Sequence, residues 1–517
     1  MGCDGQAVLL EIPEQPVVER TPEEGGKAKL KPINRDQTML ANICVDELIG
    51  ADHKARAIWE LAGRLNLSRF QEPLKTREGA AGRAAWDPRL LVSIWVYAYS
   101  EGVSSAREIE RWMEWEPGLQ WLSGLDKVNH HTLSDFRVEQ REALDELFVQ
   151  MLSLLQSQAV LSLERVMHDG TKIRAQAGAD TFRREKKLRE HLEEARQWVA
   201  SMGDPEAEAG PRERRQAARE RAARERGERL EQALQEWEVL AAEARSAEER
   251  ATVRVSETEP EARRMKHGDN AIVPSYNAQI TTEAKNKIVV GAHLSQCSSD
   301  ARSLLPAMEE VEKNLGQNPK QVVVDGGFTN RDNIVACAEK AIELIGSLPD
   351  PVERSAAAMK SVGIDPAFAP HQFRILEAGQ RLECPQGCML KYVRQSRKNG
   401  DRYRQYQARG EDCQACQYQP RCCPRKAEQG RTVSIRLEEQ ADVAAFRKKM
   451  KQAEQQAIYK QRGPVAEFPN AWIKDKLGVR KFRVRGLWKA GTELVWACLT
   501  YNIMQWLRLS RPQPMAA

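Results

Sequence analysis

A strand pattern that ends on a carboxylate constrains this chain more than any other feature. The stretch from Leu163 to Ala175 predicts a strand that reaches Asp169, turns at Gly170 and continues as a second extended piece. A carboxylate at the end of a buried strand is costly unless a cation meets it. Asp325 and Glu467 stand in similar settings far downstream. The chain can hold metal ions if its fold brings these three carboxylates together.

The composition excludes several classes of protein. The chain has 517 residues, 41% hydrophobic and 30% charged, which is enough for two or more domains. No apolar run approaches the roughly 20 residues needed to span a bilayer, and the start lacks the apolar core of a signal peptide. We therefore expect a cytoplasmic protein with reduced thiols and no membrane partner. The net charge of +5 is too small to indicate a partner, so local charge clusters must do so.

The first 160 residues divide into a tail and a helical region. Residues 1–45 mix Pro, Gly, Glu and Lys and are predicted to form a flexible tail. Residues 46–160 have helical periodicity, and the short helices after Ser105 and from His131 suit a helix-turn-helix reader of DNA. A plain helical bundle with its charges in solvent explains the same pattern. The region is thus a predicted DNA-binding domain with a structural alternative.

Residues 161–349 are predicted to form the first part of an α/β core, interrupted by a charged helical arm at 180–265. The arm is rich in Arg and Glu, and the Gly and Pro residues between Gly203 and Pro211 would fold it into a hairpin. Acids and bases alternate along it. This mixing favours a structural arm or dimer contact over a DNA contact.

The elements after the arm alternate in type. A hairpin is predicted from 275–282 and 287–294, followed by a helix at 300–315. Three valines then lead into Asp325 and two glycines, as in a central parallel strand whose carboxylate emerges at its C-terminal edge. A helix at 330–340 and a strand at 341–345 complete this unit.

Two further segments complete the chain. Residues 350–445 are predicted to form a cysteine-rich insert with its own small fold. Residues 446–510 are predicted to be the C-terminal helical part of the core, with helices through Tyr459, from Glu467 to Lys474 and from Leu494 to Leu507.

The order of these elements fits an RNase H-like mixed-sheet core. In such a core the first and fourth strands are neighbours and a late helix packs across them, so Asp169 and Asp325 would lie side by side facing Glu467. Carboxylates in this arrangement hold paired Mg²⁺ ions about 3.5 to 4 Å apart for phosphodiester chemistry. Taken singly, Asp169 and Asp325 are ordinary turn formers before glycine, and Glu467 is an ordinary exposed residue. Their combined placement favours the metal site. His168, beside the first acid, is predicted to be a neutral neighbour of the site and not a ligand.

The insert contains cysteines at zinc-ligand spacing. One cysteine, a C-x-x-C pair and one more thiol offer four ligands for a structural zinc ion, namely Cys384, Cys413, Cys416 and Cys422. Cys388 and Cys423 are spare thiols that could substitute for any of them. Reduced free cysteines are the alternative.

A basic segment follows the last acid. Between Lys474 and Lys489 one acid stands against seven basic residues, and Phe482 and Trp488 are interleaved with them. A solvated face would mix signs, so the pattern favours contact with a DNA backbone. The predicted DNA-binding residues are Lys474, Arg480, Lys481, Arg483 and Arg485.

Several blocks in the same order resemble DDE transposases of bacterial insertion sequences. They include the runs Asp169 to Ala175, Tyr276 to Gln279, Val324 to Phe328 and Arg462 to Lys474, followed by Arg485-Gly486 and Asn502. The resemblance also covers the helical N-terminal region through residues such as His53, Asp87 and Thr132 to Arg137.

The resemblance implies roles for individual residues. Asp169, Asp325 and Glu467 would be the catalytic acids and the ligands of Mg²⁺ or Mn²⁺. Tyr459, Arg462, Glu467 and Lys474 look like the Tyr-Arg-Glu-Lys signature, in which Arg462 and Lys474 contact DNA, although four residues separate Arg462 from Glu467 where the strict pattern has three. Asn470 and Ala471 replace the aromatic and glycine of many relatives, which puts local packing in question. Similar cysteines occur in an insert of related transposases.

The resemblance also implies an activity and partners. The enzyme would bind the terminal inverted repeats of its element in double-stranded DNA, cleave them, and join the freed 3′ hydroxyl to target DNA as a homodimer at the nucleoid. A catalytically inactive or domesticated DNA-binding protein and a metal-dependent nuclease without strand transfer are the alternatives.

Overall fold

A computed structural model describes most of the chain, namely residues 42–74, 84–201, 211–398, 401–425 and 427–510. The predicted tail at 1–45 lies almost wholly outside these residues. The fold is mixed α/β, in agreement with the predicted class.

The main sheet contains both strands that lead to the acidic residues. Its six strands in the described part of the chain are β1 (Arg165–Arg174), β4 (Arg263–Lys266), β5 (Ile272–Glu283), β6 (Val289–Ser295), β7 (Gln321–Val323) and β8 (Glu343–Ile345). They follow the order β4-β5-β1-β7-β8, and β6 also pairs with β5. β1 is antiparallel to β5 and parallel to β7, which is parallel to β8. The predicted adjacency of the first and fourth core strands is confirmed.

Helices cover both faces of this sheet, so its strands can be apolar on both sides. α11 (Leu304–Leu315) covers the face of the sheet that carries His168. Val311 of this helix lies against Gly291 of β6. Gly291 pairs with Thr281, which in turn pairs with His168, and paired residues share a face. α18 (Arg462–Asp475) packs on β1 and β5 from the face that carries Asp169. Successive residues of a strand point to opposite faces, so these two helices lie on opposite sides.

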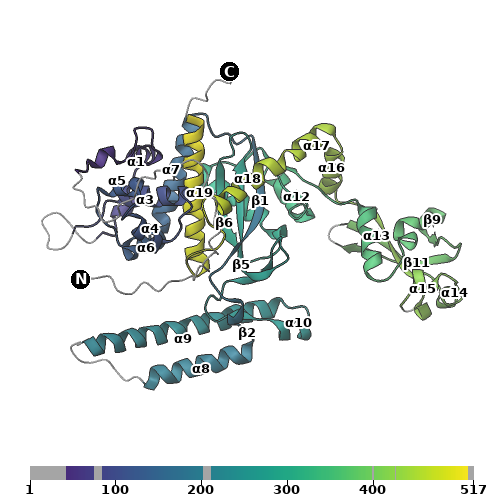
Figure 1. The fold of residues 1–517 in the computed structure, drawn as a ribbon. Helices are drawn as coiled ribbons and strands as arrows, with labels where there is room; N and C mark the ends of the chain where they lie inside the picture. The colour runs from purple at the N-terminus through teal and green to yellow at the C-terminus, as the bar shows by residue number, and fades with distance from the viewer. Residues whose placement is uncertain (1–41, 75–83, 202–210, 399–400, 426, 511–517) are drawn as a thin grey trace, which may run out of the picture. The chain divides into compact units, whose positions relative to one another are not determined.

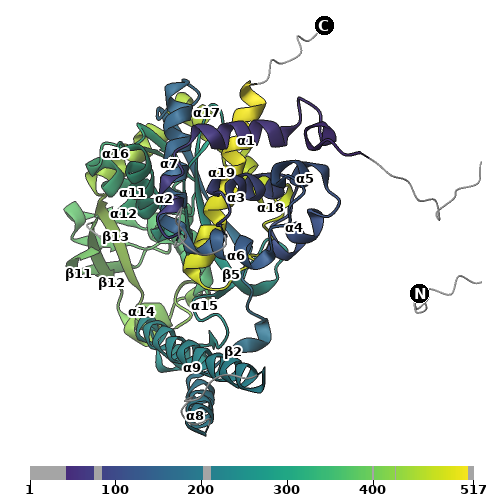
Figure 2. The ribbon, with the colours of Figure 1, turned by 90° about the vertical axis from the view of Figure 1, so that its left-hand side faces the viewer.

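The N-terminal helices share one hydrophobic core with the sheet. They are α1 (Lys54–Arg64), α2 (Ser68–Gln71), α3 (Pro88–Ser100), α4 (Ala106–Trp112), α5 (Pro117–Ser123), α6 (His130–Glu139) and α7 (Arg141–Ser157). The long helix α19 (Leu487–Ser510) packs against α3, α7 and β6 together (Figures 1 and 2). A buried ion pair adds to this link, since Arg137 lies 3.8 Å from Glu493 of α19.

α19 begins earlier than its apolar pattern predicts. The pattern starts at Leu494, whereas the helix starts at Leu487. The reason is tertiary, because the side chain of Glu261 accepts the backbone N–H of Leu487 at 2.9 Å and that of Glu259 accepts the N–H of Gly486 at 3.2 Å. Two carboxylates from another element thus cap the helix.

The charged arm is a helix pair, as predicted. α8 (Glu185–Ser201) packs against α9 (Pro211–Glu243) around a separate apolar cluster that includes Leu188, Leu230 and Trp237 (Figure 1). The predicted turn between Gly203 and Pro211 lies outside the described residues up to position 210. At the base of the arm, β2 (Phe182–Arg183) pairs with β3 (Val255–Ser256), just after the short helix α10 (Ala247–Thr252).

The region predicted as an insert contains a second sheet with its own core. Its strands are β9 (Arg374–Leu376), β10 (Arg381–Glu383), β11 (Met389–Lys398), β12 (Asp401–Gln407) and β13 (Thr432–Glu438). Leu382, Leu390, Tyr406 and Val433 form its apolar cluster. α13 (Pro351–Ser361) precedes this sheet, and α16 (Ala441–Met450) and α17 (Ala453–Lys460) lead from it to α18. Among the described helices, none combines the length and apolar character needed to cross a bilayer.

Asn502 provides a test of how α19 is attached to the sheet. Its Oδ1 accepts the backbone N–H of Val289 at 2.8 Å, and its Nδ2 donates to the carbonyl of the same residue at 2.7 Å, both in the core. We expect Asn502→Leu to lower the free energy of unfolding by about 2–4 kcal/mol, because it removes the partners of two buried backbone groups. The shift would be measured by urea denaturation. Thr500→Val is the control, since the buried Thr500 hydroxyl has no hydrogen-bond partner among the described residues. An equal loss in both variants would contradict this account.

Candidate functional site

Asp169 lies in the middle of β1, under α18. Its side chain is 18% exposed, and its Oδ2 accepts a hydrogen bond from Nδ2 of Asn470 at 3.1 Å. Burial raises the pKa of Asp169 to about 6, against the opposing effect of Arg462 and with further raising by Asp325 and Asp300. The site therefore concentrates negative charge where water is largely excluded.

Asp325 follows β7 by two residues and is positioned by its own turn. Its Oδ1 accepts the backbone N–H groups of Gly327 at 2.7 Å and Phe328 at 3.3 Å. In the parallel pair of β1 and β7, Met167 is in register with Val323. The same register continued by two residues sets Asp169 level with Asp325, in accordance with the effect of Asp325 on the pKa of Asp169.

Glu467 lies on α18 at the outer side of the site. Its side chain is 68% exposed, and the guanidinium of Arg462 stands between it and Asp169. Nη1 of Arg462 is 3.9 Å from Oδ1 of Asp169, and its Nη2 is 4.0 Å from Oε1 of Glu467. The cation that these two carboxylates share here is thus an arginine at the start of α18.

The three acids do not form a closed metal site as the side chains stand. Within the part of the chain that the structure describes, no three His, Cys, Asp or Glu side chains are grouped so that they could hold a metal ion. Asp169 and Asp325 are adjacent, whereas Glu467 points toward Arg462 and solvent.

The side chains of α18 contact β1 at two matching positions. Asn470 reaches Asp169 and Lys474 donates to the hydroxyl of Thr171, so four residues of helix correspond to two of strand. These steps span about 6 Å and 6.6 Å respectively, which lets both contacts form at once. Burial and the nearby Arg480 lower the pKa of Lys474.

Two polar residues at the site were missed by sequence reasoning. Asn470 raised only a question of packing, yet it holds Asp169, and its own Oδ1 is buried with no hydrogen-bond partner among the described residues. Asp300 was expected only to begin a helix, but its Oδ1 accepts from Asn277 at 2.7 Å and Gln279 at 3.0 Å. The sequence signal for Asp300 was indirect. Its two donors lie in the run from Tyr276 to Gln279, which resembles the transposases.

Gly170 explains how Asp300 can approach β1. A Cβ at this position would lie 2.5 Å from Oδ1 of Asp300, so a side chain would displace it. His168 lies on the same face and is fully buried, with its ring nitrogens 2.9 Å from Oγ1 of Thr281 and 3.0 Å from Oε1 of Gln279. Burial lowers the pKa of His168 to about 3, so its ring is neutral at pH 7 and both nitrogens are occupied.

The predicted basic segment runs beside the end of β1. Arg174 donates its backbone N–H to the carbonyl of Arg480 at 3.3 Å, and Phe482 donates to the carbonyl of Arg174 at 3.0 Å. Phe482 is buried and anchors the segment. Arg480 is paired with Asp475, and Nε of Arg483 reaches the hydroxyl of Ser104. Five exposed basic side chains of the segment have no ion pair in the described residues, namely Lys476, Lys481, Arg483, Arg485 and Lys489.

All six cysteines of the insert line one small cavity of about 30 Å³, together with Asp412. They are Cys384, Cys388, Cys413, Cys416, Cys422 and Cys423. The Sγ of Cys384 accepts backbone N–H groups from Gln386 at 3.3 Å and Cys388 at 3.2 Å, whereas the Sγ of Cys423 donates to the carbonyl of Arg425. Burial raises the thiol pKa values of Cys388 and Cys422 to about 11.

Two regions of the chain match known protein families. Residues 383–507 match a transposase DDE domain, and residues 43–139 match a transposase domain (DUF772). The first region contains Glu467 and the cysteine cluster, whereas Asp169 and Asp325 lie outside both. No curated protein matches the chain. The two matches support a DDE-type transposase, which is an enzyme of the nucleotidyl-transferase and endonuclease type.

The pKa of Asp169 predicts an effect on stability in the absence of metal. Because the folded-state pKa of about 6 exceeds the ordinary value of 3.8, the carboxylate is harder to ionise in the folded chain. Ionisation at pH 7.5 therefore costs on the order of 2–3 kcal/mol, and this cost is absent below the unfolded-state pKa. We expect Asp169→Asn to raise the melting temperature at pH 7.5 in EDTA and to have little effect near pH 4.

Differential scanning fluorimetry across pH 4–8 would measure this effect. Asp332→Asn, an exposed substitution on α12 (Arg331–Glu339), serves as the control. A stabilisation of Asp169→Asn that did not change with pH would contradict the charge-based explanation.

Proposed function

We propose that this chain is a DNA transposase of a bacterial insertion sequence, with an RNase H-like catalytic core. The observation that carries the proposal is the parallel register of β1 and β7, which sets Asp169 level with Asp325 beneath the helix that bears Glu467. An RNase H-like core has this neighbouring pair of strands and a late helix across them. The two family matches provide independent support.

Asp169, Asp325 and Glu467 would be the catalytic acids and would hold Mg²⁺, or Mn²⁺, because the donor set is all oxygen and Asp325 raises the pKa of Asp169. When bound, these ions activate a nucleophilic hydroxyl and stabilise the leaving oxygen of a phosphodiester. Asn470 orients the Asp169 carboxylate through its hydrogen bond to Oδ2. Since Glu467 is 68% exposed, its side chain can turn toward the other acids with little loss of packing.

The cationic residues near the acids would bind DNA. The Arg462 guanidinium stands between the carboxylates of Asp169 and Glu467. If these carboxylates held metal ions, a scissile phosphate would replace them as the partner of Arg462. Lys474 lies beside Thr171, two residues beyond Asp169 on β1. The basic segment with Arg480, Lys481, Arg483 and Arg485 follows beside the end of the same strand. The duplex substrates would be the inverted repeats of the element and target DNA.

The assembly and location follow from the proposed reaction. Joining two element ends needs two active sites, so we expect a homodimer on DNA at the nucleoid. The helical region at 46–160 would contribute to recognition of the ends, and residues 43–139 match a transposase domain.

We further propose that the cysteine cluster binds a structural zinc ion after its side chains rearrange, because no three of them are grouped as metal ligands in the described structure. Six thiols around a cavity of about 30 Å³ form a sulfur-rich donor set of the kind that zinc prefers. Cys384, Cys413, Cys416 and Cys422 would be the ligands, and the N–H groups donated to the sulfurs of Cys384 and Cys413 would stabilise their thiolates. Cys388 remains an alternative ligand. Cys423 donates its own hydrogen to a carbonyl, which favours a neutral thiol outside the ligand set.

The catalytic role of the acids can be tested by isosteric substitution. We expect Asp169→Asn, Asp325→Asn and Glu467→Gln each to reduce strand transfer by on the order of 10³-fold, because each removes a charged metal ligand. The assay would incubate full-length protein, Mg²⁺, labelled element ends and a target plasmid, and would measure joined product. Asp332→Asn and Glu309→Gln are exposed controls that should retain activity.

The same assay separates the alternatives. Cleaved ends without joined product would identify a nuclease, and binding without cleavage would identify an inactive DNA-binding protein. Full strand transfer by all three variants would exclude the catalytic assignment.

The zinc proposal predicts about one equivalent of zinc per chain by elemental analysis. We expect Cys384→Ser and Cys413→Ser to lose zinc and to lower the melting temperature, since the metal ties together distant parts of the insert. Cys423→Ser should retain zinc, and Cys297→Ser is an exposed control outside the cluster. Less than about half an equivalent of zinc in the parent protein would refute the proposal.

A further inference from the structure

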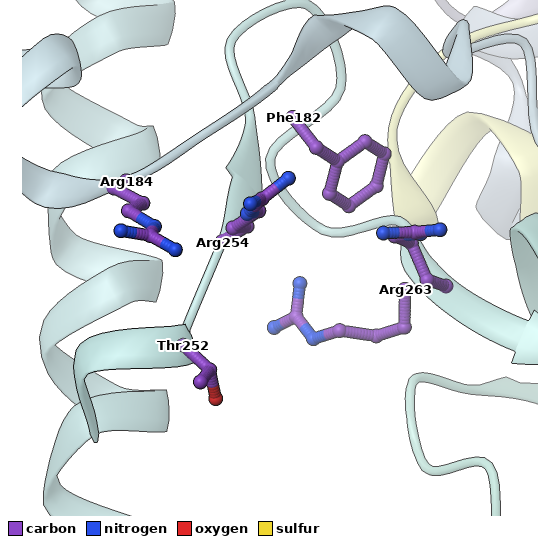
Figure 3. A pocket seen from close by; sticks show the side chains of 6 residues that line it. Phe182, Arg184, Thr252, Arg254 and Arg263 are labelled. Carbon is purple, nitrogen blue, oxygen red and sulfur yellow. The ribbon is translucent and has the colours of Figure 1, made fainter. Parts of the chain in front are cut away.

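Four arginines gather at the base of the charged arm. They line an open pocket of about 430 Å³ together with Phe182 and Thr252. The four arginines are Arg184, Arg254, Arg263 and Arg264. Figure 3 shows labelled side chains from β2 and the residue before α8, from the end of α10 and the segment that follows it, and from β4 around one space. Residues far apart in the sequence therefore present guanidinium groups to the same volume.

Three of these arginines differ from those elsewhere on the arm. Arg189 pairs with Glu185 at 2.9 Å and Arg196 pairs with Glu231 at 2.8 Å, as expected for a helix that mixes signs. In contrast, no carboxylate of the described residues forms an ion pair with any of the three, which are Arg184, Arg254 and Arg264. Arg263 is already held by Glu236 and by backbone carbonyls.

The acids closest in sequence are engaged elsewhere. Glu257 binds Arg183 and His191, and Glu261 accepts the backbone N–H of Leu487. Glu259 is fully buried and accepts from the hydroxyl of Tyr276 and from the backbone N–H of Ala177. Three of the four arginines of the pocket, Arg184, Arg254 and Arg264, thus lack a carboxylate partner among the described residues. An external anion with several oxygens would relieve their repulsion.

Hydrogen bonds connect the base of the arm to the proposed DNA-binding segment. Glu259 and Glu261 bind the backbone of Gly486 and Leu487, at the end of that segment, and both precede Arg263 by only a few positions. Gln176 donates to the carbonyl of Phe482 on the same side. These contacts tie the base of the arm to the basic segment.

Strand register places the pocket at a distance from the acids that a single bound DNA duplex can span. Arg174 is in register with Ser275, and Ser275 with Arg263, so Arg263 lies two strand spacings across the sheet from Arg174. Arg174 is five residues along β1 from Asp169. These steps amount to about 10 Å and 17 Å, which gives a separation of roughly 20 Å from Asp169. A bound duplex extends this far from a scissile phosphate within one helical turn of about 34 Å.

We propose that the arginine pocket at the base of the arm binds the phosphate backbone of duplex DNA, away from the site of cleavage. Arginine side chains present forked donors that match phosphate oxygens. The inference rests on the proposed function, and it changes the interpretation of the arm. The paired outer helices are structural, whereas the base of the arm contacts DNA.

The test compares two triple variants of equal charge change in the full-length protein. One variant carries Arg184→Gln, Arg254→Gln and Arg264→Gln. The control carries Arg189→Gln, Arg196→Gln and Arg229→Gln, which remove arginines that are paired with acids on the arm. Circular dichroism would verify that both fold. Fluorescence anisotropy would then measure affinity for a 60-bp duplex of random sequence between about 50 and 300 mM KCl.

We expect the pocket variant to bind about 10- to 10²-fold more weakly near 0.1 M salt, with the slope of log K against log salt reduced by about 2–3. The control should bind like the parent. Equal losses in both variants would attribute the effect to net charge alone, and no loss in the pocket variant would exclude DNA contact there. If a poly-glutamate peptide, and not the duplex, sensed the pocket substitutions, the pocket would belong to an acidic protein and the proposal would be wrong.

This measurement is independent of catalysis. A pocket variant that binds like the parent, from a parent that performs strand transfer, would refute the inference and leave the proposed function intact. If the pocket substitutions reduced the slope of log K against log salt, but the parent performed no strand transfer, the inference would be supported and the proposed function refuted.

Discussion

The pairing of β1 with β7 is the constraint on which the rest of the structure depends. Two strands from distant parts of the chain align in parallel, and their register brings Asp169 level with Asp325. β1 also pairs with β5, supports α18 through Asp169 and Thr171, and receives the basic segment at Arg174. Every residue proposed to act in cleavage is thus positioned relative to this one strand.

The site is assembled at a cost to the stability of the fold. Burial raises the pKa of Asp169, and nearby acids raise it further, so the fold holds a carboxylate that is reluctant to ionise. Arg462 and Asn470 partly offset this cost from α18. Such unfavourable electrostatics is typical of sites that bind cations, because a ligand relieves the repulsion only when it is bound. The arginine pocket likewise gathers groups of one charge sign, and three of its arginines have no carboxylate partner among the described residues.

Sequence patterns predicted much of this arrangement, and where they failed the reason was tertiary. The valine run before Asp325 predicted a buried parallel strand, and β7 ends two residues before that acid. Pro469 lies inside α18, where a proline is normally unfavourable, yet packing on β1 and β5 maintains the helix. Asn470 was misjudged because its partner is 301 positions away. The early start of α19 was missed because its caps come from Glu259 and Glu261.

The sequence by itself determined most helices and strands of the core, the candidate acids and the cysteine cluster, because local periodicity and residue spacing are properties of the chain alone. The tertiary structure decided which side chains meet. Only strand register could set Asp169 beside Asp325, and only folding could bring Arg462 between Asp169 and Glu467. The same holds for Arg184, Arg254 and Arg264, whose common pocket has no local signature. Contacts between distant residues depend on burial and register, which no local pattern encodes.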